Sequence, residues 1–368
     1  MSVRRLVLSS FLAYPAFAAS DGNVPFSAQH STYHLCTGHE IDARIRHLHG
    51  WLRRQKRAAQ RVTVDRLLGD SRVNLARGIH CDARGQRWTD EQMVNHSVAV
   101  YRQHDQQTPQ TRSHLQQKWT NSTLLLGKEV PAWDLLQLLH FTIDHTDRRL
   151  LYTSQFVHCL QVFRGVSRFR FSNQDAQYRR DMQLAALVHD LGKVLTLFGE
   201  EDANVDCFNR VLPGTTSMGL DNMLIQWNHD EFGYEKLRQY NLPKRVLAVV
   251  RFHSLREILW LSSPTRRSGM KQSAAAVPMK RIVNKPGTWA PGGVVTQPQG
   301  QGYMGAQDER HFLAHITEDD RSTAQFVLDF RYFDQATKNR TEEPPNDVDV
   351  DEILEILRAA FPNGRLAW

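Results

Sequence analysis

The residues best suited to chemistry include a histidine and an aspartate that stand next to each other inside an apolar segment. His189 and Asp190 lie within Leu-Val-His-Asp-Leu-Gly-Lys, residues 187–193, where the apolar spacing predicts a helix. A buried carboxylate is costly unless it is satisfied, and a metal ion is one of the few groups that can satisfy it. Lys193 follows His189 by four residues, so we expect it on the same face of the helix, one turn on.

Four other segments carry a candidate metal ligand on or beside an apolar stripe. With the first pair they make a set of four imidazoles and two carboxylates: His158, His189, Asp190, His229, His253 and Asp334. Six ligands are more than a mononuclear site usually takes from the protein, so the set suits two metals with one bridging carboxylate. Imidazole and carboxylate without thiolate fit iron, manganese or zinc. The alternative is a set of polar residues satisfied inside a helical core, which is difficult to achieve for so many without a metal.

The elements that must hold these ligands are amphipathic helices, with apolar residues at spacings of three and four. Alternation typical of strands is almost absent, so the expected fold class is all-α. The pattern predicts helices at 133–143, 155–169, 181–198, 220–237, 243–261, 323–337 and 350–361.

Composition restricts the class of protein. The chain has 368 residues, 41% of them hydrophobic and 23% charged, as expected for a globular protein that works in water. No apolar run reaches the roughly eighteen residues of a membrane span, so we expect no membrane partner. The formal charge is +7, but residues 258–307 hold six basic residues and no acidic one, so the rest of the chain is close to neutral. This uneven distribution argues against a nucleic-acid partner.

The chain divides into four parts by composition. Residues 1–20 resemble a short signal peptide, and residues 21–95 form a polar extension with one helical stretch, 41–68. Residues 96–368 form the expected helical domain, interrupted at 258–307 by an insertion rich in Gly, Pro, Ser and Gln, for which we predict disorder. The four cysteines lie far apart, which favours reduced thiols over a disulfide scaffold.

Several stretches of the chain form a recognisable set in sequence order. They are the His-Asp stretch 187–194, residues 219–232 around His229, Arg-Phe-His-Ser at 251–254, Tyr-Phe-Asp-Gln-Ala-Thr-Lys at 332–338, and the C-terminal stretches 347–349 and 366–368. Together they resemble the myo-inositol oxygenases, a branch of the HD-domain superfamily. The resemblance covers roughly residues 96–255 and 308–368. It implies an HD-domain-like helical bundle around a dinuclear metal site.

The resemblance also implies an activity, the conversion of myo-inositol and O2 to D-glucuronate at a mixed-valent Fe(II)/Fe(III) centre with two iron ions per chain. His158, His189 and Asp334 would hold one iron, His229 and His253 the other, and Asp190 would bridge them. Lys193 would contact the metal-bound alkoxide of the substrate as the catalytic cation. The residues implied in substrate binding are Asp144, Thr146, Lys193, His253, Ser254 and Lys338. The implied protein is a monomer of inositol catabolism in the cytoplasm, although the signal-like N-terminus leaves secretion open.

The sequence departs from the family at three places. His145 stands where the family has an acidic residue, residues 200–217 are several dozen residues shorter than the usual loop, and the insertion 258–307 is extra. An imperfect gene model is one explanation for the last two, and sequencing the transcript tests it. Two alternatives stay open: another HD-superfamily metalloenzyme, either a phosphohydrolase or an oxygenase of a different polyol or phosphonate, and an inactive helical homologue.

Overall fold

The computed structural model describes residues 38–56, 65–79, 81, 86–106, 112–121, 126–147, 149–169, 171, 176–205, 209, 211, 219–255, 258 and 315–368. The fold over these residues is all-α, as predicted, with one small two-stranded sheet. The predicted signal peptide and the insertion, apart from Ile258, lie outside the described residues. Among those that are described, no helix is both long and apolar enough to cross a membrane.

The helical elements in chain order are α2 (Gly38–Arg54), η1 (Leu75–Gly78), α4 (Asp90–Gln106), α5 (Arg112–Asn121), α6 (Ala132–Leu138), η2 (Leu139–Phe141), α7 (Gln155–Arg168), α8 (Ala176–Val188), η3 (Leu191–Phe198), η4 (Asp202–Asn204), α9 (Gly219–Asn222), α10 (His229–Leu237), α11 (Lys244–Phe252), α13 (Glu318–Ala336), α14 (Val350–Ala360) and η8 (Pro362–Gly364). Strand β1 (Glu129–Pro131) pairs antiparallel with β2 (Arg365–Ala367).

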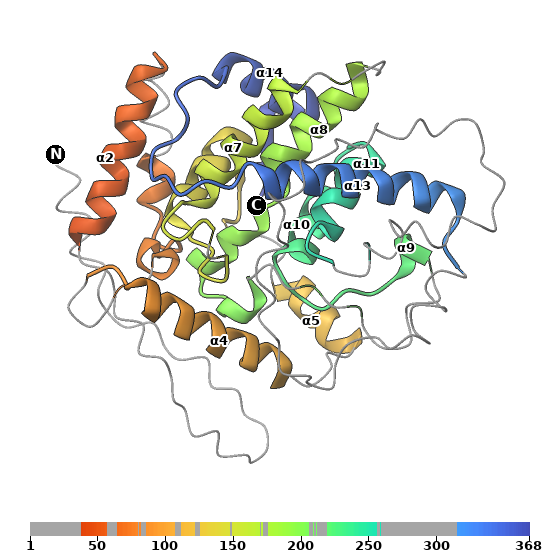
Figure 1. The fold of residues 1–368 in the computed structure, drawn as a ribbon, viewed down its shortest axis with the longest axis horizontal. Helices are drawn as coiled ribbons and strands as arrows, with labels where there is room; N and C mark the ends of the chain where they lie inside the picture. The colour runs from red at the N-terminus through yellow and green to blue at the C-terminus, as the bar shows by residue number, and fades with distance from the viewer. Residues whose placement is uncertain are drawn as a thin grey trace, which may run out of the picture.

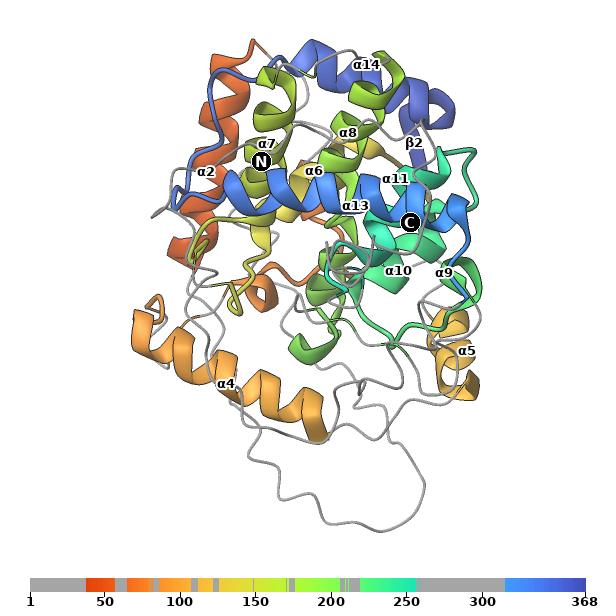
Figure 2. The same ribbon diagram turned by 45° about the vertical axis from the view of Figure 1, so that its right-hand side comes forward.

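The centre of the molecule is built from α7, α8, α10, α11 and α13. Helix α7 packs along α8, α11 packs between α8 and α10, and α13 crosses α7, α8 and α11 (Figures 1 and 2). The apolar stripes of these helices meet in one continuous core that includes fully buried Phe156, Leu187, Val249 and Phe330. The core therefore surrounds the helix ends that carry the candidate ligands.

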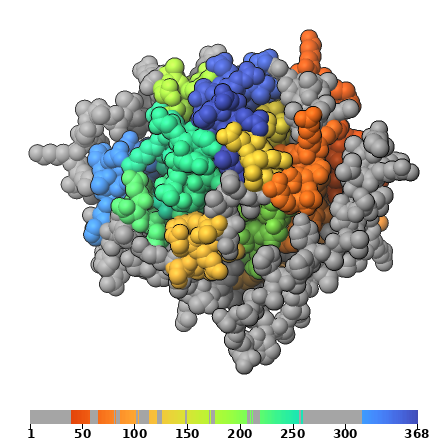
Figure 3. All heavy atoms as spheres, turned by 180° about the vertical axis from the view of Figure 1, so that it is seen from behind, coloured from red at the N-terminus to blue at the C-terminus, as the bar shows by residue number. Residues whose placement is uncertain are grey.

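The two ends of the described chain close this core. Helix α14 packs on α8 and α6, and the pairing of β2 with β1 brings the C-terminal Trp368 to full burial beside Phe232, with ring centroids 5.3 Å apart. Seen from behind, the segment of β1 and α6 lies between the C-terminal residues and α2 (Figure 3). Helix α2 buries Trp51 completely, and its Arg44 donates to the carbonyls of His140 and Tyr152 at 3.0 and 3.1 Å. The part of the N-terminal extension that forms α2 is thus integral to the packing.

Three predicted helices are wrong in their extent. The helix expected at 181–198 ends at Val188 as α8 and resumes at Leu191 as the 3-10 helix η3. The helix expected at 220–237 is divided into α9 and α10, because the Asn228 side chain accepts a hydrogen bond from the Glu231 amide at 3.0 Å and starts a new helix at His229. The helix expected at 243–261 ends as α11 at Phe252.

Other boundaries differ for similar local reasons. The stretch 133–143 is α6 followed by the 3-10 turn η2. Of the helical stretch expected at 41–68, the first part is α2, which begins earlier and ends at Arg54; residues 57–64 lie outside the described residues, and residues 65–68 are helical. Helix α13 begins before the expected residue 323, since Thr317 and Asp320 form a capping box. Among the cysteines, Cys159 is free and buried, but Cys81 is disulfide-bonded, so the prediction of reduced thiols is wrong there. Cys36 and Cys207 lie outside the described residues.

Candidate metal centre

The six candidate ligands come from five helix positions and lie together in the core. His158 is on α7, His189 and Asp190 follow the end of α8, and His229 is the first residue of α10. His253 directly follows α11, and Asp334 is on α13. Each of the six residues is at most 5% exposed. They are His158, His189, Asp190, His229, His253 and Asp334.

Asp190 is the centre of the cluster, and its two oxygens face different imidazoles. Oδ2 lies 3.4 Å from His189 Nε2, while Oδ1 lies 3.4 Å from His229 Nε2 and 3.4 Å from His253 Nε2. Two donors that each bind one ion at about 2.1 Å, at about 90–110°, lie about 3.0–3.4 Å apart, whereas hydrogen bonds of this type span about 2.7–3.2 Å. The spacing therefore fits two metal positions that share one carboxylate.

The backbone holds the rings of His189 and His253 so that Nε2 of each ring faces the Asp190 carboxylate. His189 Nδ1 lies 3.2 Å from the Ala186 carbonyl, and His253 Nδ1 lies 3.1 Å from the Val249 carbonyl. Because a carbonyl only accepts, each Nδ1 carries the proton, and each Nε2 keeps its lone pair for a ligand. In both cases the accepting carbonyl belongs to the helix that ends just before the histidine. The end of that helix therefore fixes the orientation of the ring.

Unpaired polar atoms in the cluster point to a cation. His189 Nε2 and Asp190 Oδ1 are buried and make no hydrogen bond, although buried polar atoms are nearly always paired. Two groups have ligand atoms close enough to share one ion: His158 with His189 and Asp190, and Asp190 with His229 and His253. Asp190 belongs to both groups. The residues present thus fit a pair of metal ions in imidazole and carboxylate coordination.

Asp334 joins the cluster through His158. The imidazole Nε2 lies 2.9 Å from Asp334 Oδ1 at hydrogen-bond distance, and the His158 and His189 rings are 5.4 Å apart. Burial lowers the pKa of His158 to about 4 despite the neighbouring carboxylate, so this ring is neutral. Burial alone would raise the pKa of Asp334, but Lys338 and the hydrogen bond from His158 hold it well below its ordinary value. Asp334 is therefore an anion available to a metal.

Lys193 connects the cluster to the residues implied in substrate binding. Its Nζ lies 3.2 Å from Asp190 Oδ2 and 2.8 Å from Asp144 Oδ2, and it donates to Gln155 Oε1 at 3.1 Å. Burial alone would raise the pKa of Asp190, but the charge of the neighbouring Lys193 ammonium outweighs it and holds this pKa well below its ordinary value. Both carboxylates are thus paired with one buried ammonium.

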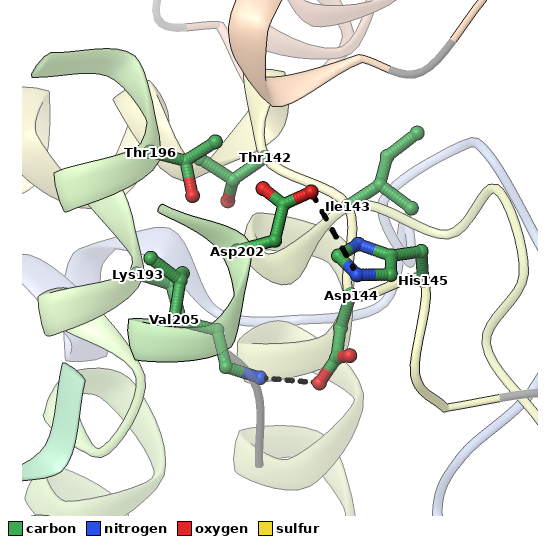
Figure 4. A pocket seen from close by; sticks show the side chains of 8 residues that line it. All are labelled: Thr142, Ile143, Asp144, His145, Lys193, Thr196, Asp202 and Val205. Atoms are coloured by element: carbon green, nitrogen blue, oxygen red, sulfur yellow. Dashed lines mark hydrogen bonds and ion pairs between the residues drawn. The ribbon is translucent and has the colours of Figure 1, made fainter. Parts of the chain in front are cut away.

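A small pocket opens beside this ammonium (Figure 4). It is lined by Thr142, Ile143, Asp144, His145, Lys193, Thr196, Asp202 and Val205. The Thr146 hydroxyl donates to Asp144 at 2.6 Å, which fixes the carboxylate at the pocket wall. The implied substrate residues Asp144, Thr146 and Lys193 therefore lie together.

Of the three other implied substrate residues, His253 is itself a candidate ligand, and Ser254 and Lys338 contact ligands directly. Ser254 Oγ lies 3.3 Å from His253 Nε2, and Lys338 Nζ lies 3.4 Å from Asp334 Oδ1. Lys338 also forms an ion pair with Asp147 at 2.7 Å. With Lys193 and Lys338, two ammonium groups adjoin the candidate metal ligands.

Sequence reasoning missed two residues of this region. Asp147 faces Lys338. Its position next to Thr146 in the sequence was the only signal that could have pointed to a place in the site. Gln155, the first residue of α7, faces Lys193 from 38 positions away in the chain, and no local pattern indicates it.

Asp230 lies against two of the ligand imidazoles, and Glu231 has a structural partner. Asp230 Oδ1 lies 2.8 Å from His229 Nε2 and 3.3 Å from His253 Nδ1, and Asn209 donates to its other oxygen at 2.9 Å. Glu231 instead accepts from Arg251 at 2.8 and 3.1 Å, with both side chains buried. Of these two acidic residues, which directly follow His229, only Asp230 contacts the candidate ligands.

The fold and the cluster define an all-α protein with a buried site suited to metal ions. Comparison with known proteins agrees with this class: the sequence model of the family described as myo-inositol oxygenase matches residues 93–212 and 212–262. Five of the six candidate ligands fall within these residues, and Asp334 falls outside them. The resemblance to the myo-inositol oxygenase family is thereby confirmed.

Individual relatives carry the same description. The chain is 26% identical to inositol oxygenase of Homo sapiens over 160 residues, which are 34% of this chain and 54% of that protein. It is 28% identical to inositol oxygenase 2 of Arabidopsis thaliana over 161 residues (34% and 49%), and 30% identical to a probable inositol oxygenase of Oryza sativa subsp. japonica over 161 residues (34% and 50%). The chain spans about half the length of the curated relatives it matches.

Proposed function

We propose that this protein is an inositol oxygenase, which converts myo-inositol and O2 to D-glucuronate and water at a centre of two iron ions. The observation that carries the proposal is the geometry of Asp190, whose two oxygens face separate imidazole groups while its Oδ2 lies 3.2 Å from the Lys193 ammonium. The family resemblance supports the choice of substrate. The expected cytoplasmic location and monomeric state follow from the same proposal.

In this proposal each ligand has one role. His158, His189 and Asp334 hold the first iron, His229 and His253 hold the second, and Asp190 bridges them. When bound, the iron pair supplies O2 activation and one-electron chemistry, which acid and base residues alone cannot bring to an aliphatic polyol. Burial keeps the His158 imidazole neutral, and the backbone carbonyls that face Nδ1 of His189 and His253 leave Nε2 of each ring available, which favours this coordination.

Lys193 acts on the proton of a substrate hydroxyl. An ammonium beside a bound hydroxyl oxygen favours the deprotonated form of that oxygen, because the opposite charge stabilises the alkoxide. Asp144 lies 2.8 Å from the same ammonium and accepts a hydrogen bond from Thr146. Its carboxylate is therefore placed to accept a hydrogen bond from a second hydroxyl of the substrate. His253, Ser254 and Lys338 complete the proposed contacts to the polyol.

The surroundings of the ligands exclude bulk water. The Phe330 ring lies 5.1 Å from the His189 ring and 6.4 Å from that of His253, and it is fully buried. Apolar walls of this kind protect reactive oxygen chemistry from side reactions with solvent. The adjoining pocket has room for about one water molecule, so a polyol must separate lining side chains as it enters.

The charges around the pocket favour a neutral polyol over a phosphate ester. Lys193 is the only ammonium among the described lining residues, and it already faces the carboxylates of Asp144 and Asp190, while Asp202 adds a further acid to the wall. Carboxylates repel a phosphate dianion but accept hydrogen bonds from hydroxyl groups. A phosphohydrolase is therefore the less favoured alternative.

The proposal is tested by O2 uptake of the iron-reconstituted full chain with myo-inositol, with D-glucuronate measured in parallel. We expect one glucuronate per O2 consumed, and His229→Ala is expected to lose the activity together with iron. His49→Ala is the matched control, because His49 also contacts an aspartate at 2.8 Å but lies outside the cluster. Phosphate release from a nucleotide without O2 uptake would overturn the proposal, and iron binding without turnover of any polyol would favour the inactive homologue.

A further inference from the structure

A second group of metal-competent side chains lies across the pocket from Lys193. It consists of His96 on α4, His145 in the loop after η2 and Asp202 at the start of η4. The ligand atoms of these three residues all lie within 4.8 Å of one another. None of them belongs to the set proposed to hold iron.

The geometry of this group repeats a feature of the first cluster, because one carboxylate oxygen faces two imidazole nitrogens. Asp202 Oδ2 lies 2.8 Å from His96 Nε2 and 4.0 Å from His145 Nε2. The two rings are 4.4 Å apart, and the three side chains are only 5–9% exposed. A slight lengthening of the His96–Asp202 contact and a shift of His145 toward Asp202 would bring all three donors to the distances of one coordination sphere.

The backbone around the group is fixed by direct contacts. The Ser97 hydroxyl, one residue after His96, lies 2.5 Å from the His145 carbonyl oxygen and 2.9 Å from the Met93 carbonyl oxygen, and its one hydrogen is shared between these two acceptors. Trp88 packs on the His96 ring with centroids 4.7 Å apart. Helix α4 is thus positioned against both other elements, and a ligand set held in this way loses little freedom on binding an ion.

We propose that His96, His145 and Asp202 bind one divalent cation of the zinc class, independently of the iron centre. Two imidazoles and one carboxylate without thiolate suit Zn²⁺ and the neighbouring first-row dications. Three protein ligands leave a position for water, and both His145 and Asp202 line the pocket that contains Lys193 (Figure 4). The ion links α4 and η4 to the loop that carries Asp144, so it stabilises one wall of the pocket.

The site is tested by counting the metal bound to the full chain after chelation and dialysis against Zn²⁺, and by the visible absorption of Co²⁺ bound in its place. In an Asp190→Asn background, which removes the proposed bridge of the iron centre, we expect one remaining equivalent. His145→Gln in that background is expected to lose this equivalent and the Co²⁺ bands. His49→Gln is the matched control, since His49 contacts Asp65 at the same 2.8 Å distance but belongs to no group with a third ligand among the described residues.

Three further measurements keep the outcome unambiguous. His96→Gln must reproduce the loss, and far-UV circular dichroism must show that each variant keeps the helicity of its parent. Zn²⁺ is expected to raise the thermal midpoint of the Asp190→Asn chain but not of its His145→Gln derivative. An Asp190→Asn chain that binds no Zn²⁺, or a His145→Gln derivative that keeps the full equivalent, overturns the proposal whatever the outcome for inositol turnover.

Discussion

Gly192 offers the sharpest test of how the fold holds its candidate ligands. It lies in η3 between Asp190 and Lys193, where the chain passes directly over the first residue of α10. A Cβ atom at this position would lie 1.9 Å from the His229 carbonyl oxygen and 2.7 Å from its carbonyl carbon. Such contacts are essentially never shorter than 3.0 Å, so Gly192→Ala must separate η3 and α10 by at least 1.1 Å there.

This separation acts directly on the proposed metal centre. Asp190 and His229 stand on the two segments that are forced apart, and their facing atoms are 3.4 Å apart in the structure. A displacement of about 1 Å between groups that must act together costs on the order of 10²-fold in rate. We therefore expect Gly192→Ala to keep its helical content, to bind less iron at the His229 side, and to lose activity by about that factor.

The assay compares iron content, thermal midpoint and inositol-dependent O2 uptake with those of Gly50→Ala. At Gly50, on α2, the nearest atoms to an added Cβ belong to arginine side chains at 3.6 and 3.8 Å, so the change is tolerated. Alanine there is expected to stabilise the protein by up to about 1 kcal/mol, because glycine is a poor helix former. A Gly192→Ala protein with iron content and activity within twofold of the unmodified chain would refute the argument.

Three other substitutions probe separate parts of the site and core. Lys193→Met is expected to keep both metals but to lower kcat about 10²–10³-fold, as for removal of a group that stabilises a developing anion; an unchanged kcat with a raised KM would assign Lys193 to binding alone. Glu231→Gln leaves the buried charge of Arg251 without its counter-ion and should lower the free energy of unfolding by about 3–5 kcal/mol, whereas Glu343→Gln, in an exposed pair, should cost less than about 1 kcal/mol in the same urea titration. Burial lowers the pKa of Lys236 to about 8. Between pH 8 and 10.5 the unfolded chain therefore binds more protons than the folded chain, so the free energy of unfolding should rise with pH over that window. Lys236→Met should therefore be more stable than the unmodified chain at pH 7, by about 1–3 kcal/mol, with an advantage that shrinks as the pH approaches 10.5; an advantage that does not change with pH would contradict the cause given.

The sequence allowed the all-α fold and the six candidate ligands to be predicted, because both depend on local patterns. Apolar spacing identifies a helix, and a histidine or aspartate on an apolar stripe stands out against it. Helix ends were harder to predict, since the Asn228 cap and the Thr317 capping box act through single hydrogen bonds that leave the periodicity unchanged. The break after Val188 likewise interrupts a stretch whose apolar pattern continues.

Contacts between distant residues could not be predicted from local patterns. Lys193 meets Asp144 and Gln155 across 49 and 38 positions, and the His96 contact to Asp202 spans 106. Each of these distances depends on how whole helices pack, which the spacing within one helix does not encode. His145 illustrates the difference: in the sequence it was only a departure from a family pattern, while the structure gives it a neighbouring carboxylate and a second imidazole.

The helix break at His189 and Asp190 explains how neighbours in sequence can serve one site. On a continuous helix, adjacent side chains diverge by about 100° around the axis, so the His and the Asp would face different surroundings. Here α8 ends before them and η3 starts after them, which leaves the Asp190 oxygens 3.4 Å from imidazoles of three different segments. The close approach of Gly192 to His229 then brings the start of α10, which carries His229, within reach of Asp190. A longer helix without this break would be more regular, but it would separate the Asp190 carboxylate from the histidines that it contacts.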